Sequence, residues 1–212
     1  HLRPRRQRQM CIRDRNRPAE RFENNILAIN IEENLPFSLT PDQKKSYQEI
    51  AEDMASGSPM LRLLQGDVGS GKTIVAALIA AHVVEDQKQV VILAPTTILA
   101  NQHYESFCEW YGDNENIVLL TSKLPVREKR EIYQKISDGI VKIIIGTHAV
   151  FQNELIYQNL SLVIYDEQHR FGVNQRLKLK EKANDYPHQL LLSATPIPRT
   201  MAVSYTHLRA HE

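Results

Sequence analysis

Cysteine is scarce in this sequence, and long apolar runs are missing altogether. The two cysteines among the 212 residues, Cys11 and Cys108, are too few for a disulfide framework and show no metal-ligand spacing. No apolar stretch approaches the roughly 20 residues of a membrane-spanning helix, and the first residues lack the apolar segment of a secretion signal. These absences disfavour a disulfide-stapled secreted domain, a cysteine-based metal site and a membrane protein. They indicate a protein of the reducing cytoplasm.

The composition is otherwise that of an ordinary globular protein. Hydrophobic residues make up 42% of the chain and charged residues 24%, and there are no internal repeats or low-complexity tracts. A chain of this length is sufficient for one well-packed domain, or at most for two small ones.

The net charge of +1 conceals an uneven distribution. Residues 1–17 contain seven arginines and one acidic residue, and residues 204–212 contain one arginine and one glutamate. Without these segments 18 basic and 23 acidic residues remain, which is a net charge of −5. The end sequences "RQRQMCIRDR" and "VSYTHLRAHE" resemble translated sequencing adapters, so we expect both segments to be non-native and to pack on nothing. The alternative is an Arg-rich arm that binds nucleic acid.

Helical and strand patterns alternate along the rest of the chain, after an expected linker over residues 18–39. Thr40 is suited to cap a helix that begins at Pro41, and Gly57 is suited to end it. Short runs rich in Val, Ile and Leu, separated mostly by helices, indicate a parallel sheet covered on both faces. We therefore predict one α/β domain over residues 40–203, with a doubly wound parallel sheet flanked by helices.

The remaining elements follow from the same patterns. Strands are predicted over residues 61–65, 90–94, 118–121, 142–146, 162–165 and 189–193, and helices over residues 72–85, 98–110 and 126–137. The core is expected to include Met60, Leu64, Leu78, Ile92, Leu99, Ile144 and Leu191.

The sequence "GDVGSGKT" at residues 66–73 follows the first predicted strand and precedes a helix. It satisfies G-x-x-x-x-G-K-[ST], a loop whose glycines let backbone N–H groups and a helix N-terminus surround a chain of phosphates. Lys72 is expected to bridge the β- and γ-phosphates of ATP, and the Thr73 hydroxyl to hold Mg²⁺. The loop residues expected to bind the nucleotide are Gly66, Gly69, Ser70, Gly71, Lys72 and Thr73.

A second polar cluster stands at the end of the apolar strand in "LVIYDEQHRFGV". Ligands of such sheets bind at the carboxyl ends of the strands. Asp166 is suited to bind Mg²⁺ directly or through water, and Glu167 to polarise the attacking water. An Asp-Glu pair could otherwise cap a following helix, and His169 could be a local hydrogen-bonding residue.

Together these segments resemble the motifs of superfamily-two helicases. The stretches "GDVGSGKT", "APTTILANQH", "GTHAV", "DEQHRFGV" and "SATPIPRT" look like motifs I, Ia, Ic, II and III, and the resemblance covers about residues 35–202. It implies a RecA-like P-loop NTPase fold and, above all, similarity to bacterial ATP-dependent helicases that act on branched DNA in recombination, repair and replication-fork processing. The alternative is the translocase module of a transcription-repair coupling factor, which typically has Phe at the position of Ser70 and Glu at that of Gln168.

The resemblance implies further roles. Gln43 matches a glutamine that reads the adenine edge, with Phe37 near the base, although Thr40 and Gln43 also form a capping-box pattern. The residues implied to contact DNA are Thr96, Thr97, Gln102, His103, Thr147 and His148, where helix capping by the threonines is the alternative. The residues implied to couple nucleotide state to DNA are Gln168, His169, Arg170, Ser193 and Thr195.

Proteins of this kind also carry an N-terminal wedge domain and a second RecA-like lobe that supplies an arginine finger. We expect this chain to be the first lobe of a two-lobed motor, nearly inactive in isolation, with DNA as its partner and no membrane association. Two other classes stay open, namely a different P-loop enzyme such as a small-molecule kinase and a nucleotide-dependent binding module. DNA-stimulated release of phosphate would distinguish the motor from both.

Overall fold

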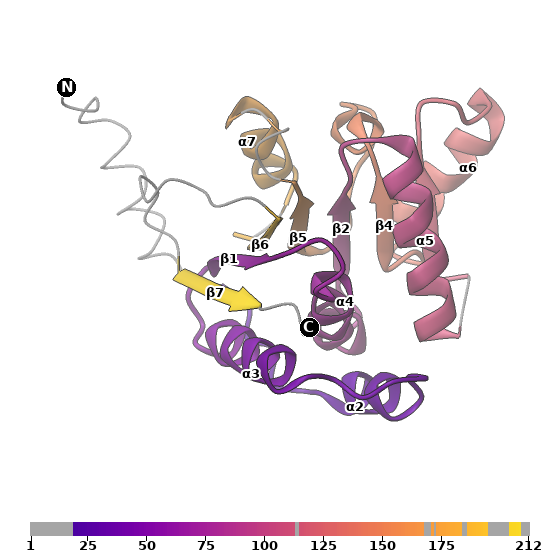
Figure 1. Cartoon of the computed structure of the whole chain (residues 1–212). Helices are drawn as coiled ribbons and strands as arrows, with labels where there is room; N and C mark the ends of the chain where they lie inside the picture. The colour runs from indigo at the N-terminus through magenta and orange to yellow at the C-terminus, as the bar shows by residue number, and fades with distance from the viewer. Residues whose placement is uncertain are drawn as a thin grey trace, which may run out of the picture.

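The computed structural model of the chain describes residues 19–112, 115–167, 171, 173–183, 186–194 and 204–208. Across these residues seven parallel strands form one sheet in the order β3-β4-β2-β5-β6-β1-β7 (Figure 1). Every strand and helix expected from the sequence forms, with small shifts at its ends. The predicted α/β architecture is therefore confirmed.

The strands are β1 (Leu61–Gly66), β2 (Gln89–Leu93), β3 (Ile117–Leu120), β4 (Ile143–Gly146), β5 (Leu160–Asp166), β6 (His188–Ser193) and β7 (Ser204–Leu208). The helices are α2 (Ile26–Glu33), α3 (Pro41–Ala55), α4 (Lys72–Glu85), α5 (Thr97–Tyr111), α6 (Val126–Ser137) and α7 (Val173–Lys182), with a short 3₁₀ helix, η1 (His148–Phe151). As expected, Thr40 caps α3, Pro41 opens it, and Gly57 follows its end with a positive φ of 76°.

The sheet separates two hydrophobic clusters, because successive side chains of a strand point to opposite faces. Leu162 and Ile164 of β5 pack on one face with residues of α4 and α5, whereas Val163 and Tyr165 pack on the other face with residues of α6 and η1. Strands buried on both faces read as continuous runs of Val, Ile and Leu, which is the pattern seen in the sequence.

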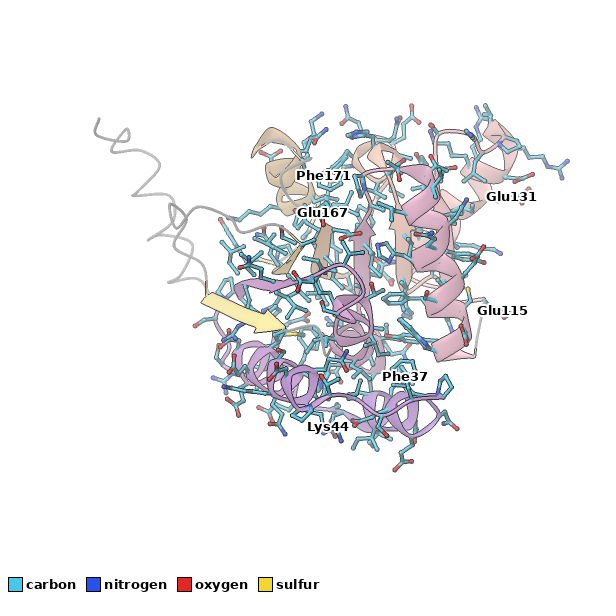
Figure 2. The ribbon with its side chains drawn as sticks, in the orientation of Figure 1. Phe37, Lys44, Glu115, Glu131, Glu167 and Phe171 are labelled. Atoms are coloured by element: carbon cyan, nitrogen blue, oxygen red, sulfur yellow. The ribbon has the colours of Figure 1, made fainter. Side chains whose placement is uncertain are left out.

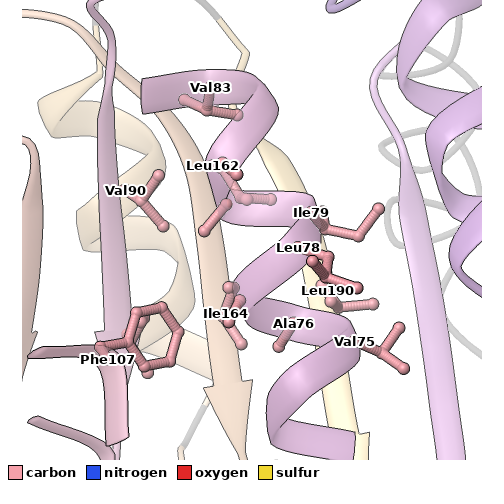
Figure 3. Close-up of a cluster of buried hydrophobic side chains, with 14 of the residues drawn as sticks. Val75, Ala76, Leu78, Ile79, Val83, Val90, Phe107, Leu162, Ile164 and Leu190 are labelled. Atoms are coloured by element: carbon pink, nitrogen blue, oxygen red, sulfur yellow. The ribbon is translucent and has the colours of Figure 1, made fainter. Parts of the chain in front are cut away.

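Helix α4 is the most deeply buried helix of the first face. Figure 3 shows its side chains, among them Val75 and Leu78, packed against Leu162, Ile164 and Leu190 of the neighbouring strands. All ten residues from Ile74 to Val83 are buried. Six of the seven predicted core residues are buried, and Leu99 is half-buried and packs against the same cluster.

Residues 19–39 differ from the linker that the sequence suggested. They contain helix α2, which packs against α4 and buries Ala28 and Ile31. Phe22 is only 2% exposed and contacts the ring of His188, while the Glu20 carboxylate bonds to Lys88 and Ser161. Helix α2 is too short to show a clear amphipathic pattern, so the sequence did not predict it. The segment is nevertheless part of the lobe.

A further difference concerns residues 204–208. They form β7, which pairs in parallel with β1 from Arg62↔Ser204 to Gly66↔Leu208. The expectation that this segment packs on nothing is wrong for these five residues. The sequence analysis took residues 204–212 to be non-native, which is why it assigned no element there. The segment of residues 1–17 lies outside the described residues.

The described helices include none that is both long and apolar enough to cross a membrane.

Candidate nucleotide-binding site

The loop of residues 66–73 connects the end of β1 to the start of α4. Gly69 and Gly71 have φ values of +83° and +79°, a conformation that residues with a Cβ rarely adopt. A Cβ on Gly71 would also lie 2.1 Å from Nε2 of Gln43. Gly71 stands at the N-cap of α4 without a side-chain cap, so the first N–H groups of this 14-residue helix are available to an anion.

Lys72 lies inside this loop rather than in solvent. Its ammonium donates hydrogen bonds of 2.7 Å to the backbone carbonyls of Gly66 and of Asp67. Partial burial lowers the pKa of Lys72, while the attraction of Asp166, Glu167 and Asp67 opposes that shift. The lysine is therefore close to both carboxylates of the second polar cluster, as the P-loop assignment requires.

Two observations on the loop itself test whether a phosphate chain fits. The hydroxyl of Ser70 is buried and has no hydrogen-bond partner among the described residues, which leaves a polar group that an anion would satisfy. A Cβ at Gly69 would meet nothing within 4 Å, so the tip of the loop is open. The residues present fit a nucleotide phosphate, and Thr73 on the first turn of α4 is half-buried.

Gln43 fulfils the capping-box interpretation and makes one contact more. Its N–H donates to the hydroxyl of Thr40 over 3.2 Å, and its side-chain oxygen accepts from the N–H of Thr40 over 2.9 Å. Its Nε2 also donates to the carbonyl of Ser70 over 3.0 Å. The capping box is confirmed, and the same side chain connects α3 to the P-loop. Phe37 is 46% exposed and lines a hollow of about 530 Å³ with Leu35 and other residues around α2.

Asp166 and Glu167 stand at the carboxyl end of β5. Strand β6 lies between β5 and β1, so Ser193 at its end separates the P-loop from Asp166. Asp166 is 9% exposed. Glu167 is half-buried and adopts a φ of +49°, which is uncommon for a residue with a Cβ. Such strain is concentrated at functional sites, where the surrounding structure maintains it.

The Glu167 carboxylate is oriented by the neighbouring strand. Its Oε1 accepts a hydrogen bond of 3.2 Å from the backbone N–H of Ala194, the residue after β6. Figure 2 shows Glu167 and Phe171 near each other at this end of the sheet, well apart from Phe37 and Lys44. The geometry suits a base that must face the terminal phosphate, with its carboxylate fixed from β6.

The four predicted DNA-contact residues around the start of α5 separate into two groups. Thr96 caps the helix by accepting from the N–H of Leu99 over 3.2 Å, so the capping alternative is confirmed for this residue, which is nonetheless exposed. Gln102 is exposed and Thr97 is half-buried. His103 points inward, where its Nε2 lies 2.8 Å from Oδ2 of Asp166. The ring of His103 is buried, and its assignment as a DNA contact stays a prediction.

The two predicted DNA-contact residues at η1 also differ in exposure. Thr147 is buried, whereas His148 is exposed and its Nδ1 lies 3.2 Å from Nε2 of Gln175 on α7. Lys182, at the other end of α7, donates to the carbonyls of Gln152 and Leu155 over 2.7 and 2.6 Å. The sequence analysis predicted no helix at α7 and singled out neither Gln175 nor Lys182. A lysine in the last turn of a helix was the available signal.

Four predicted coupling residues, Gln168, His169, Arg170 and Thr195, lie outside the described residues, as does Arg199. No group of three or more His, Cys, Asp or Glu side chains that could hold a metal occurs among the residues described. A cation at this site would therefore need ligands of another kind, such as the Thr73 hydroxyl and nucleotide phosphates beside Asp166.

Comparison with known families gives one match over most of the chain. Residues 40–203 match the family model described as DEAD/DEAH box helicase. The chain is 51% identical over 174 residues to the ATP-dependent DNA helicase RecG of Aquifex aeolicus, a stretch that covers 81% of this chain and 22% of that protein. It is 46% identical over 187 residues to RecG of Escherichia coli strain K12, covering 86% and 26% respectively. The chain thus spans about a quarter of the length of these relatives.

Solved structures of helicases are also similar to this chain. A structure of RecG bound to a three-way DNA junction superposes with a TM-score of 0.80 at 37% identity, covering 96% of this chain and 28% of that one. The helicase domain of Pyrococcus furiosus Hef superposes with a TM-score of 0.60 at 25% identity, covering 78% and 37%. Both likenesses extend over the lobe that carries the P-loop.

Proposed function

Because the chain belongs to the DEAD/DEAH box helicase family, we propose that it forms the ATP-binding lobe of a RecG-like DNA helicase. Such a helicase acts on branched DNA in recombination, DNA repair and replication-fork processing. The observation that carries the proposal is the convergence of the P-loop, Asp166 and Glu167 at the carboxyl ends of β1 and β5, with Ser193 between them. ATP hydrolysis in P-loop enzymes uses a loop that binds the phosphates, an acidic residue that holds Mg²⁺ and a residue that positions the attacking water.

The loop supplies the binding of the phosphates. Backbone N–H groups at Gly69 and Gly71 and the N-terminus of α4 face the negative charge, and Lys72 exchanges its two carbonyl partners for phosphate oxygens. Gln43 contacts the same loop through Ser70, which supports its role in recognising the base.

Thr73 and Asp166 are the residues that would hold Mg²⁺. The cation, when bound, neutralises charge on the β- and γ-phosphates. Glu167 accepts a proton from the attacking water and is fixed for this task by the N–H of Ala194. Each step assigned to this lobe is thus carried by a side chain at one end of the sheet.

The lobe also binds DNA in this proposal. Thr96 and Gln102 are exposed at α5 and His148 at η1, where short polar side chains can bond to phosphates. Thr97 and Thr147 stand beside them at the same strand ends. Ser193, with Gln168, His169, Arg170 and Thr195, would transmit nucleotide state between the two sites. A second RecA-like lobe with an arginine finger and an N-terminal wedge domain would complete the motor.

The test is ATP hydrolysis by a protein that contains both lobes, measured with and without a three-way junction and with a duplex of equal length. A RecG-like motor predicts clear stimulation and unwinding by the junction. Turnover that no DNA alters would favour a non-motor P-loop enzyme and overturn the proposal.

A further inference from the structure

His103 is a polar residue on the apolar face of α5. The buried side chains of this helix are Ala100, His103 and Phe107, which recur at the spacing of one helical face. The adjacent Gln102 is exposed. A histidine buried among apolar groups needs a hydrogen-bond partner, and the identity of that partner decides what the residue does.

The partner is the carboxylate of Asp166. Nε2 of His103 lies 2.8 Å from Oδ2 of Asp166, and the two side chains are only 10% and 13% exposed. The contact joins residues 63 positions apart in the sequence. It is therefore a tertiary contact that the fold must build.

The topology of the sheet explains how the two groups meet. Strands β2 and β5 are neighbours, with Leu93 paired to Tyr165, and α5 begins shortly after β2 ends. By the alternation of β5, Asp166 faces the same side of the sheet as Leu162 and Ile164, which pack in the cluster shared with α4 and α5. The carboxylate at the end of β5 consequently meets the inner face of α5.

We propose that His103 is a positioning residue for the cation-binding carboxylate. By donating to Oδ2 it fixes the rotamer of Asp166 and leaves Oδ1 without a hydrogen-bond partner among the described residues. Carboxylates that bind metals are generally oriented by such outer hydrogen bonds, and loss of one lowers metal affinity by about 10- to 100-fold. The inference rests on the proposed function, because it takes Asp166 as the Mg²⁺ ligand.

The same contact connects two predicted sites. α5 carries the exposed Thr96 and Gln102 at its outer surface and His103 at its inner surface. A displacement of this helix would therefore act on Asp166 directly, through one hydrogen bond.

The experiment measures binding of a fluorescent ADP analogue to the full 212-residue chain, first in EDTA and then across a Mg²⁺ titration. His103→Phe keeps the ring in the apolar face but removes the donor, and His103→Gln restores a donor at a similar reach. Glu105→Gln, on the exposed face of the same helix, is the matched control. Asp166→Asn reports on the cation site itself.

The expected result is that His103→Phe binds the analogue in EDTA as the unmodified chain does, but needs about 10- to 100-fold more Mg²⁺ for half of the metal effect. His103→Gln should recover most of this loss, and Glu105→Gln should show none. An unchanged Mg²⁺ dependence in His103→Phe, or an equal loss in EDTA, would overturn the inference. If His103→Phe does not fold, His103→Asn makes the same test, because its shorter amide does not reach Asp166.

The proposed function would fail in a different way. If Asp166→Asn and the unmodified chain respond equally to Mg²⁺, Asp166 is not the cation ligand, and both the cation assignment and the inference are wrong. If Asp166→Asn loses the Mg²⁺ effect while His103→Phe retains it, only the inference is wrong.

Discussion

The backbone N–H of Ala194 donates to Oε1 of Glu167 over 3.2 Å, from the end of β6 to the end of β5. Glu167 adopts this position with a left-handed φ of +49°. The contact orients one oxygen of the Glu167 carboxylate. It also makes Glu167 sensitive to the position of the segment after β6, which is the segment that resembles motif III.

The first prediction concerns Glu167→Gln in a protein with both lobes. The amide oxygen can still accept from Ala194, so the structure and ATP binding should persist, but the base is lost and hydrolysis should fall about 10²- to 10⁴-fold. Steady-state ATPase and nucleotide affinity measure the two effects. Glu181→Gln, an exposed position on α7, is the control. Unchanged turnover in Glu167→Gln would refute the assignment of the base.

The second prediction concerns Lys72→Ala. Charge-assisted hydrogen bonds contribute about 1.5–3 kcal/mol each, so nucleotide affinity should fall by at least about tenfold and hydrolysis should fall with it. Calorimetric titration of the chain with MgADP measures the affinity. Lys129→Ala, on exposed α6, should bind as the unmodified chain does, and equal affinities for the two variants would contradict the P-loop assignment.

A third prediction tests whether residues 19–39 belong to the lobe. Phe22 is 2% exposed, and Phe→Ala substitutions at buried positions cost about 3–5 kcal/mol. Phe22→Ala should therefore lower the free energy of unfolding by a similar amount in urea denaturation. Phe37→Ala, which truncates a ring that is 46% exposed, should cost much less. A negligible effect of Phe22→Ala would return this segment to the role of a linker.

A fourth prediction concerns acid stability. Nδ1 of His188 accepts from the N–H of Met60 over 3.1 Å, and Nε2 bonds to the carbonyl of Glu20 over 2.9 Å, so the neutral ring matches both partners. Burial lowers the pKa of His188, and burial likewise lowers that of His82. Because the unfolded chain binds protons more readily, stability should be complete above the unfolded pKa of about 6.5 and fall as pH decreases below it.

Urea denaturation between pH 5 and pH 8 measures this dependence. His188→Gln should make the pH dependence shallower, even if the variant is less stable throughout, since one of the two described histidines with a lowered pKa is removed. A slope identical to that of the unmodified chain would show that His188 does not contribute.

The sequence predicted the parts of this molecule that local patterns encode. Runs of Val, Ile and Leu identified β1 to β6, and the glycines with Lys72 identified the P-loop, because each needs only consecutive residues. The capping box at Thr40 and Gln43 was visible for the same reason.

Other features depend on contacts that no local pattern shows. His103 lies on the buried face of α5. The family resemblance implied a contact with DNA, whereas its hydrogen-bond partner Asp166 is 63 positions away in the sequence. Helix α2 is short and is stabilised by packing on α4, and α7 carries few apolar residues. Parallel pairing of β7 with β1 is likewise a tertiary property.

We infer that residues 40–203 form a nucleotide-binding lobe whose hydrolysis of ATP is slow in isolation, because the family resemblance implies that the arginine finger comes from a second lobe. The most direct test measures MgADP binding and ATPase activity of the chain alone, with and without a three-way DNA junction. We predict that the chain binds MgADP and that its turnover is about 10³- to 10⁵-fold below that of a two-lobed protein, because an arginine finger accounts for a factor of that size. We also predict little stimulation by DNA, since the net charge of −5 over residues 18–203 offers little attraction for phosphates. Robust DNA-stimulated turnover by the chain alone would contradict the inference that fast hydrolysis needs a second lobe.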